Sequence, residues 1–142
     1  MKHVLVVEDD PHNAVLFRKL LEKRAGCRVT VTDAADELMN HVAGGAVDLV
    51  IMDVSLVNAR WEGHAVSGID LCRLLRQDPR SAGIPIVIAT AHAMRGDEER
   101  LIAETRADGY IAKPIVDHEA FVRRIVSLLE EAACSSPARS RS

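Results

Sequence analysis

The sequence predicts an α/β fold, a five-stranded doubly wound parallel sheet with five helices. Short runs rich in Val and Ile alternate with longer segments whose apolar residues recur at helical spacing. Some runs are apolar throughout, as in Val4–Val7 and Val87–Ala89, which indicates strands that are covered on both faces. Because crossovers between parallel strands are right-handed, these observations favour the strand order 2-1-3-4-5.

The apolar runs predict five strands. They cover His3–Val7, Arg28–Thr32, Asp48–Met52, Ile84–Ala89 and Gly109–Ala112. A helical segment follows each run, so the chain is a series of βα units. The carboxyl ends of parallel strands meet at one edge of the sheet, where ligands bind in this class of fold.

Start and stop signals mark the first two helices. We expect Asp10 and Asp33 to cap them, and Pro11 supports the first start. Gly26 is expected to end the first helix, and Gly44–Gly45 to close the second at about residue 42.

Apolar stripes predict the remaining helices. The third centres on residues 71–75 and stops before Pro79, the fourth covers roughly Arg95–Arg106, and the fifth contains residues 121–129. The fourth is weakly patterned. We expect one domain over residues 1–133 and a disordered tail over 134–142, because the tail lacks core-forming residues.

Bulk properties narrow the class of protein. The 142 residues are 48% hydrophobic and 27% charged, and the net charge of −3 gives nucleic-acid binding no electrostatic support. No apolar stretch approaches the roughly 20 residues of a membrane span, and the first residues do not resemble a signal peptide. Three widely spaced cysteines (Cys27, Cys72 and Cys134) argue against a disulfide framework or a zinc site. We therefore expect a cytoplasmic protein.

Polar residues follow four of the apolar runs. Glu8 and Asp9 follow the first, Asp53 the third, Thr90 the fourth and Lys113 the fifth. An ionised side chain at the end of a buried strand is costly unless it is paired. The predicted topology gathers all five residues at one edge of the sheet, which indicates a functional site.

The gathered side chains suit phosphoryl chemistry. Two carboxylates at about 4 Å repel by about 4 kcal/mol at an effective dielectric of about 20, so a cation or a raised pKa is expected. Few, solvent-accessible oxygen ligands suit Mg²⁺. With Mg²⁺ and Lys113 neutralising a phosphoryl group, Asp53 is a plausible nucleophile, and Thr90 can donate a hydrogen bond to a phosphoryl oxygen.

Four segments resemble the receiver domain of two-component response regulators, which has the flavodoxin-like fold with strand order 2-1-3-4-5. The resemblance covers about residues 2–132. The matching segments are Val-Leu-Val-Val-Glu-Asp-Asp-Pro at 4–11, Asp-Leu-Val-Ile-Met-Asp at 48–53, Ile-Pro-Ile-Val-Ile-Ala-Thr-Ala at 84–91 and Asp-Gly-Tyr-Ile-Ala-Lys-Pro at 108–114.

The resemblance implies a phosphoacceptor switch rather than an enzyme with a separate substrate. Asp53 would accept a phosphoryl group from a phosphohistidine on a sensor histidine kinase or phosphotransfer protein, and the domain would catalyse only its own phosphorylation and dephosphorylation. Asp9, Asp53 and the backbone carbonyl of Ser55 would bind Mg²⁺ directly, and Glu8 would act through water.

The resemblance also implies how the signal leaves the site. Thr90 and Tyr110 would form the switch pair, and the step from Lys113 to Pro114 is often a cis peptide bond in this family. A downstream protein would bind the face formed by helix 4, strand 5 and helix 5, and a homodimer is a further possibility. The short tail leads us to expect a stand-alone protein.

The chain departs from the family pattern after Asp53. The loop over residues 54–68 is longer by roughly seven residues, lacks the usual proline and contains Trp61. It is either a lid or partner-docking element, or a tolerated insertion in which Trp61 packs for stability. His92 either modulates the acyl phosphate or is an exposed loop histidine, and the second interpretation is favoured.

Three alternatives to the switch can be stated. An interaction module that no longer depends on phosphorylation is kept open by the altered loop. A phosphatase working through an aspartyl phosphate would need an acid at position 55, which is Ser55. A flavin-binding flavodoxin is disfavoured, because the acidic loop after the first strand would repel the cofactor phosphate.

Overall fold

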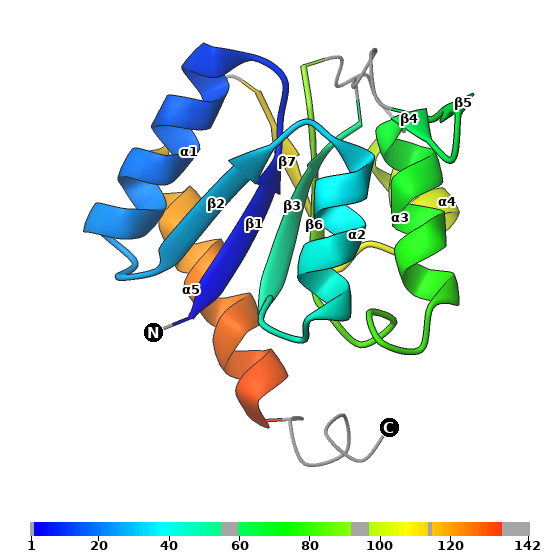
Figure 1. The fold of residues 1–142 in the computed structure, drawn as a ribbon. Coiled ribbons are helices and arrows are strands. Elements are labelled where there is room, and N and C mark those ends of the chain that lie inside the picture. The colour runs from blue at the N-terminus through cyan, green and yellow to red at the C-terminus, as the bar shows by residue number, and fades with distance from the viewer. Residues whose placement is uncertain (1, 55–59, 92–96, 114, 135–142) are drawn as a thin grey trace.

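The computed structural model describes residues 2–54, 60–91, 97–113 and 115–134. Within them, a five-stranded sheet has the order β2-β1-β3-β6-β7, and every neighbouring pair is parallel (Figure 1). The strands are β1 (His3–Val7), β2 (Arg28–Thr32), β3 (Leu49–Asp53), β6 (Ile86–Thr90) and β7 (Gly109–Ala112). Counted along this sheet alone, the order is 2-1-3-4-5, so the predicted topology is confirmed.

Helices cover both faces of this sheet (Figure 1). On one face lie α1 (Pro11–Lys23) and α5 (His118–Cys134); on the other lie α2 (Ala35–Ala43), α3 (Gly68–Gln77) and α4 (Asp97–Thr105). Within β1, Val4 and Val6 belong to the core on the α1 and α5 side, whereas Leu5 and Val7 belong to the core under α2 and α3. This double burial explains why the strand sequences are apolar without alternation.

Two strands begin and end later in the chain than predicted, and each ends one residue later. Asp53 is the last residue of β3, where it pairs in register with Ala89, and Thr90 is the last residue of β6. The backbone amide of Val54 donates to the carbonyl of Ala89 over 3.0 Å. The backbone of the candidate site residues at these ends is therefore held by the ladder itself rather than by the loops that follow.

The start of α1 is as predicted, and its end is not. The Asp10 side chain caps the helix by accepting a hydrogen bond from the backbone amide of His12 over 2.9 Å. The helix ends at Lys23 with Arg24 as its C-cap, before Gly26, which lies in the following turn at φ +65°.

The predicted cap of the second helix is wrong. The N-cap of α2 is Ala34, not Asp33. The hydroxyl of Thr32 accepts from the amide of Ala34 over 3.1 Å and donates to Glu37 over 2.6 Å. Because Thr32 is the last residue of β2 and is buried, its hydroxyl reaches these groups from the sheet, whereas Asp33 is exposed.

The long segment after β3 contains a second, two-stranded sheet that the sequence analysis missed. β4 (Arg60–Trp61) and β5 (His64–Ala65) pair antiparallel through a two-residue turn. Both turn residues have positive φ, +51° at Glu62 and +82° at Gly63, as the favoured type I′ hairpin turn requires. Trp61 is half-buried against the core under α2 and α3, which supports the interpretation that it packs for stability.

The other helices agree with the predicted stripes. α4 covers Asp97–Thr105 of the expected Arg95–Arg106, and Arg95 lies outside the described residues. Cys134 is the last residue of α5, and the rest of the expected tail, 135–142, lies outside the described part. The domain boundary therefore stays a prediction.

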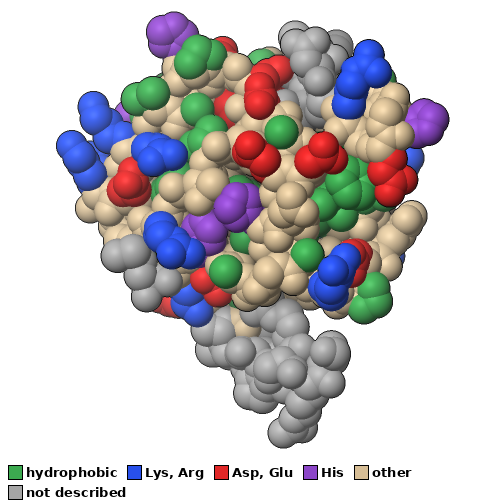
Figure 2. Space-filling view, viewed as in Figure 1, with side chains coloured by type: hydrophobic (Ala, Val, Ile, Leu, Met, Phe, Trp, Pro, Cys, Tyr) green, Lys and Arg blue, Asp and Glu red, His purple; other side chains and the backbone are tan. Residues whose placement is uncertain are grey.

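The described surface carries charges of both signs. Acidic and basic side chains are interspersed over the face seen in Figure 2. Cys27 and Cys72 are buried free thiols. None of the described helices is long and apolar enough to cross a bilayer.

Candidate functional site

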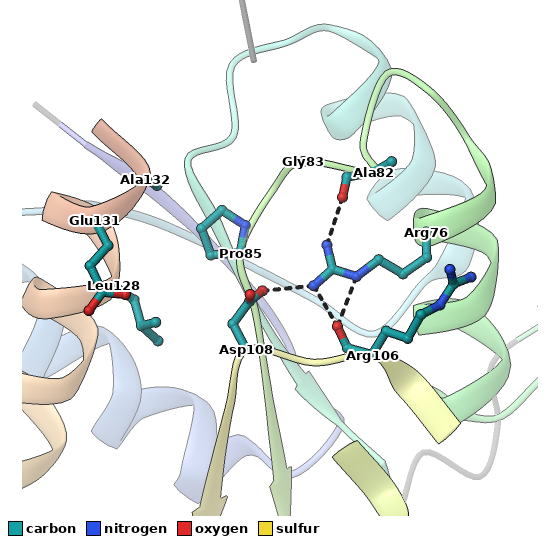
Figure 3. A pocket seen from close by; sticks show the side chains of 9 residues that line it. All are labelled: Arg76, Ala82, Gly83, Pro85, Arg106, Asp108, Leu128, Glu131 and Ala132. Atoms are coloured by element: carbon teal, nitrogen blue, oxygen red, sulfur yellow. Dashed lines mark hydrogen bonds and ion pairs between the residues drawn. The ribbon is translucent and has the colours of Figure 1, made fainter. Parts of the chain in front are cut away.

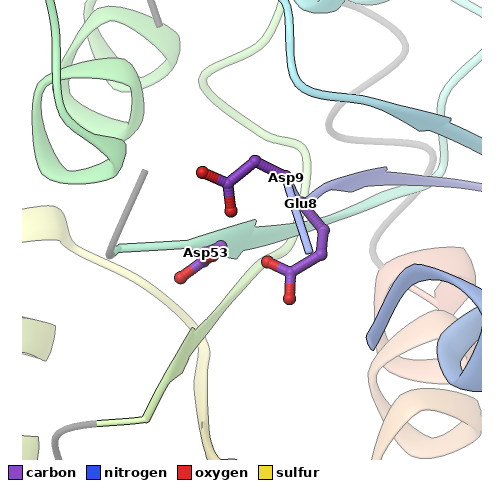
Figure 4. Close-up of side chains that lie close together, drawn as sticks. All are labelled: Glu8, Asp9 and Asp53. Atoms are coloured by element: carbon purple, nitrogen blue, oxygen red, sulfur yellow. The ribbon is translucent and has the colours of Figure 1, made fainter. Parts of the chain in front are cut away.

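Three carboxylates meet at the carboxyl edge of the main sheet. Glu8 and Asp9 directly follow β1, and Asp53 ends the neighbouring strand β3 (Figure 4). One oxygen atom from each of the three lies within 4.8 Å of the others. The backbone of Glu8 is held by its amide, which donates to the carbonyl of Thr32 over 3.0 Å.

Lys113 supplies the positive charge of the site. Its ammonium lies 2.9 Å from Oε1 of Glu8 and 3.3 Å from Oδ2 of Asp53. The lysine directly follows β7, and its backbone amide donates to the carbonyl of Thr90 over 2.8 Å. Its side chain is only 6% exposed, so these charges interact with little screening by water.

The buried charges of the site change the pKa of Glu8. Burial, followed by its hydrogen bond with Asp53, raises the pKa of Glu8 to about 7, against the lowering effect of Lys113. Burial by itself lowers the pKa of Lys113, but the hydrogen bond with Glu8 and the charges of Asp53 and Glu8 bring it above its usual value. One ammonium among three carboxylates leaves excess negative charge, which a cation or a shared proton would relieve.

Of the two predicted switch residues, Thr90 lies at this edge, and Tyr110 lies within β7, where it pairs with Ile88. Thr90 is buried at the end of β6, one residue beyond the partner of Asp53 in the ladder. Tyr110 of β7 is half-buried against the core under α2 and α3, and its hydroxyl oxygen is enclosed. The structure therefore brings Glu8, Asp9, Asp53 and Lys113 together and places Thr90 beside them.

Three predicted residues lie outside the described part of the chain. They are Ser55, whose carbonyl was expected to bind the metal, His92, and Pro114 of the expected cis step. Trp61 is described and lies in the hairpin, packed on the core. The roles proposed for these residues stay predictions.

The described donors suit Mg²⁺. Glu8, Asp9 and Asp53 offer hard carboxylate oxygens, and Asp9 is only partly buried, so that a cation could keep several of its waters. No histidine or cysteine belongs to this group among the described residues, which disfavours zinc.

Sequence reasoning missed the contact that ties α3 to the site. An added Cβ at Gly68 would overlap the carbonyl oxygen of Asp53 and would lie 2.7 Å from Cα of Val54. The helix start is fixed by a capping box, in which Ser67 accepts from the amide of Asp70 over 3.1 Å and Asp70 accepts from the amide of Ser67 over 3.0 Å. The spacing Ser67-x-x-Asp70 is the available sequence signal.

A pocket of about 560 Å³ opens at the opposite edge of the sheet (Figure 3). Arg76 lies in it, and its five N–H groups make five hydrogen bonds. They go to the carbonyls of Arg106 (two bonds), Ala82 and Ile84 and to the carboxylate of Asp108, over 2.7 to 3.0 Å. Since the arginine is fully engaged, this cluster joins the ends of α3 and α4 to the sheet.

Comparison with known proteins places the chain in a family. The family model for the response regulator receiver domain matches residues 4–134. The chain is 35% identical over 131 residues to the polar-differentiation response regulator DivK of Brucella ovis, covering 92% of this chain and 98% of that protein. The chain belongs to the family of response regulator receiver domains.

Solved structures agree with the fold. A CheY-like response regulator receiver domain protein from Methanospirillum hungatei matches with a TM-score of 0.77 and 21% identity, covering 95% of this chain and 98% of that one. The receiver domain of a sensor histidine kinase from Pseudomonas aeruginosa matches with a TM-score of 0.70 and 26% identity, over 88% and 93% of the two chains. That structure has a magnesium ion in its active-site cleft.

Membership of this family distinguishes a signalling domain from the phosphatase and the flavodoxin considered as alternatives. Receiver domains are signalling modules, so the phosphatase and flavodoxin alternatives lose their support. The chain is therefore a receiver domain of the two-component response regulator family.

Proposed function

We propose that this receiver domain is a phosphoacceptor switch in a two-component phosphorelay, in which Asp53 takes a phosphoryl group from a phosphohistidine. The donor is a sensor histidine kinase or a phosphotransfer protein. The observation that carries the proposal is the Asp53 carboxylate, which ends β3 with the Lys113 ammonium 3.3 Å away and with Glu8 and Asp9 beside it.

The chemistry follows from these neighbours. An oxygen of Asp53 attacks phosphorus, a P–O bond forms, and the P–N bond breaks with its electron pair passing to the departing imidazole. Lys113 offsets the negative charge that builds up on the phosphoryl oxygens, and the hydroxyl of Thr90 donates a hydrogen bond to one of them. Attack by water later breaks the P–O bond, releases phosphate and restores the carboxylate.

The metal site is part of the proposal. Asp9 and Asp53 would hold Mg²⁺ directly, with the Ser55 carbonyl as the third protein ligand and Glu8 acting through water. When bound, Mg²⁺ supplies the charge neutralisation that lets a dianionic phosphoryl group approach a carboxylate. The carboxylate oxygens and the magnesium ion of the Pseudomonas aeruginosa relative support this assignment.

The output is altered protein binding. We assign it to the face of α4, β7 and α5, where Tyr110 follows the movement of Thr90 and turns inward. This face carries a groove of about 270 Å³ between β7 and α5, and Val116 beside it is 92% exposed. Homodimer formation and a cytoplasmic location are part of the same proposal.

Labelling with a small phosphodonor tests the proposal. Incubation with acetyl phosphate and Mg²⁺ should add one phosphoryl group, detected by intact mass, and Asp53→Asn should abolish the addition. Asp10→Asn is the matched control: Asp10 is the adjacent acid that caps α1, and Asn caps a helix equally well, so labelling should persist. Absence of labelling in the wild type would contradict the proposal and favour a module that binds without phosphorylation.

A further inference from the structure

The hairpin of β4 and β5 belongs to an excursion of the chain that leaves and returns at Asp53. The chain leaves the sheet after Asp53 and comes back at Gly68, whose backbone packs directly on the carbonyl of Asp53. A side chain at position 68 would collide with this backbone, so the two ends of the excursion are in van der Waals contact.

The hairpin is held from two sides. Trp61 packs against the core beneath α2, and the Ser67–Asp70 capping box fixes the return into α3. The tight turn at Glu62 and Gly63 joins the two short strands. The hairpin is therefore held in place beside the start of α3, at the end of the molecule where the strands of the main sheet end (Figure 1).

The hairpin presents polar side chains to solvent. Arg60, Glu62 and His64 are all exposed. Ala65 precedes Gly68 by three residues, and three residues of extended chain span at most about 11 Å. Ala65 thus lies within about 11 Å of a residue that touches the Asp53 backbone.

A protein that donates a phosphoryl group from a histidine must contact the surface around Asp53. The side chain of Asp53 is only 3% exposed, so a donor histidine has to enter the site while its own surface rests on the surrounding edge. A standard-size interface buries about 600–1,000 Å² per partner, which as a circular patch has a radius of roughly 14–18 Å. The hairpin lies at the same end of the molecule as the carboxyl end of β3, so a patch centred on Asp53 extends toward the exposed hairpin (Figure 1).

We propose that the exposed side chains of the hairpin (Arg60, Glu62 and His64) form a docking surface for the protein that carries the phosphohistidine and help to select that protein. The proposal rests on the proposed function and adds a specificity surface to it. A small phosphodonor makes no contact beyond the site, so the hairpin side chains affect protein donors only.

The test compares a hairpin variant with wild type on two kinds of donor. The variant combines Arg60→Gln, Glu62→Asn and His64→Gln, where Asn tolerates the positive φ at position 62. The control variant Glu22→Gln, Lys23→Gln, Arg24→Gln changes exposed charges at the end of α1, at the opposite edge of the sheet. The donors are acetyl phosphate and the ³²P-labelled transmitter and phosphotransfer domains of the histidine kinases encoded in the same genome.

The expected result is a selective loss. The rate of transfer from the preferred protein donor should fall by about tenfold in the hairpin variant, while the acetyl phosphate rate and the control variant stay as in wild type. An unchanged protein-donor rate, or an equal loss with acetyl phosphate, overturns the docking surface. If acetyl phosphate labels the protein but no protein donor transfers to it, the docking surface is also overturned, while Asp53 stays the proposed phosphoacceptor. If the wild type is not labelled by any donor, the proposed function itself is contradicted.

Discussion

Gly68 at the start of α3 packs on the backbone of Asp53 at the end of β3, with no room for a Cβ between them. The residue that opens a helix is thereby in contact with the residue proposed as the phosphoacceptor. We therefore expect a change that displaces α3 to affect both the stability of the domain and the position of Asp53, and hence the rate of phosphorylation.

Gly68→Ala is expected to destabilise the domain and slow its phosphorylation. The added methyl group must displace backbone atoms of Asp53 and Val54, and overpacking of this kind costs about 1–3 kcal/mol. Urea denaturation and the acetyl phosphate labelling rate measure the two effects. Gly44→Ala is the control, since a Cβ there meets only ordinary contacts at 3.5 Å; equal losses in both variants would show that the close contact at Gly68 is unimportant.

Stability should fall with rising pH through the titration of Glu8. The pKa of Glu8 is raised from 4.5 to about 7, so between these values the folded chain keeps a proton that the unfolded chain has released. Stability is therefore greatest below about pH 4.5 for this group and is lost as pH rises toward 7, by on the order of 1–3 kcal/mol.

The difference between wild type and Glu8→Gln isolates this contribution. Thermal unfolding in EDTA at pH 5 and pH 8 should show a steeper loss in wild type than in the variant. Mg²⁺ added at pH 8 should restore wild-type stability, because it neutralises the same carboxylates. Parallel pH curves for the two proteins would rule out Glu8 as the cause.

Arg76→Met should destabilise the domain by about 2–4 kcal/mol, because several hydrogen bonds from a buried charge are lost together. The side chain is 10% exposed and joins the ends of α3 and α4 to the sheet (Figure 3). Arg76→Lys should recover only part of the loss, since an ammonium cannot reproduce the planar array of donors. Arg80→Met, at a largely exposed ion pair with Asp78, should leave the urea midpoint unchanged; a similar small effect at Arg76 would contradict its anchoring role.

Trp61→Ala should reduce stability by about 1–3 kcal/mol, as expected for a half-buried aromatic side chain. Labelling of Asp53 by acetyl phosphate should persist, because Trp61 anchors the hairpin to the core beneath α2. Val116→Ala, at a residue 92% exposed, serves as the control in the same denaturation series. A labelling defect without a loss of stability would instead favour the lid interpretation of the loop.

The main sheet could be predicted because its strands are buried on both faces. A run such as Val4–Val7 is apolar at every position, as expected for a strand covered on both faces. The topology of the parallel sheet then carries Asp9, Asp53 and Lys113 to one edge. Local signals also sufficed for the Asp10 cap, whose partner lies two residues away.

The N-cap of α2 was predicted wrongly and the hairpin was not predicted, because the local sequence carried a misleading signal in the first case and a weak one in the second. Asp33 had the residue type of a helix cap, yet Thr32 reaches the same groups from the end of β2. The hairpin strands are two residues long, too short for any periodicity to mark them, and only Gly63 signalled the turn.

The sequence by itself determined the fold class and the chemical content of the site, because burial pattern and residue type are local properties. Only the tertiary structure decided how Lys113 is shared between Glu8 and Asp53, why Gly68 must lack a side chain, and where Arg76 finds the acceptors for its five hydrogen bonds. Each of these depends on distances of a few ångströms between residues far apart in the chain, which are set by how the helices pack on the sheet.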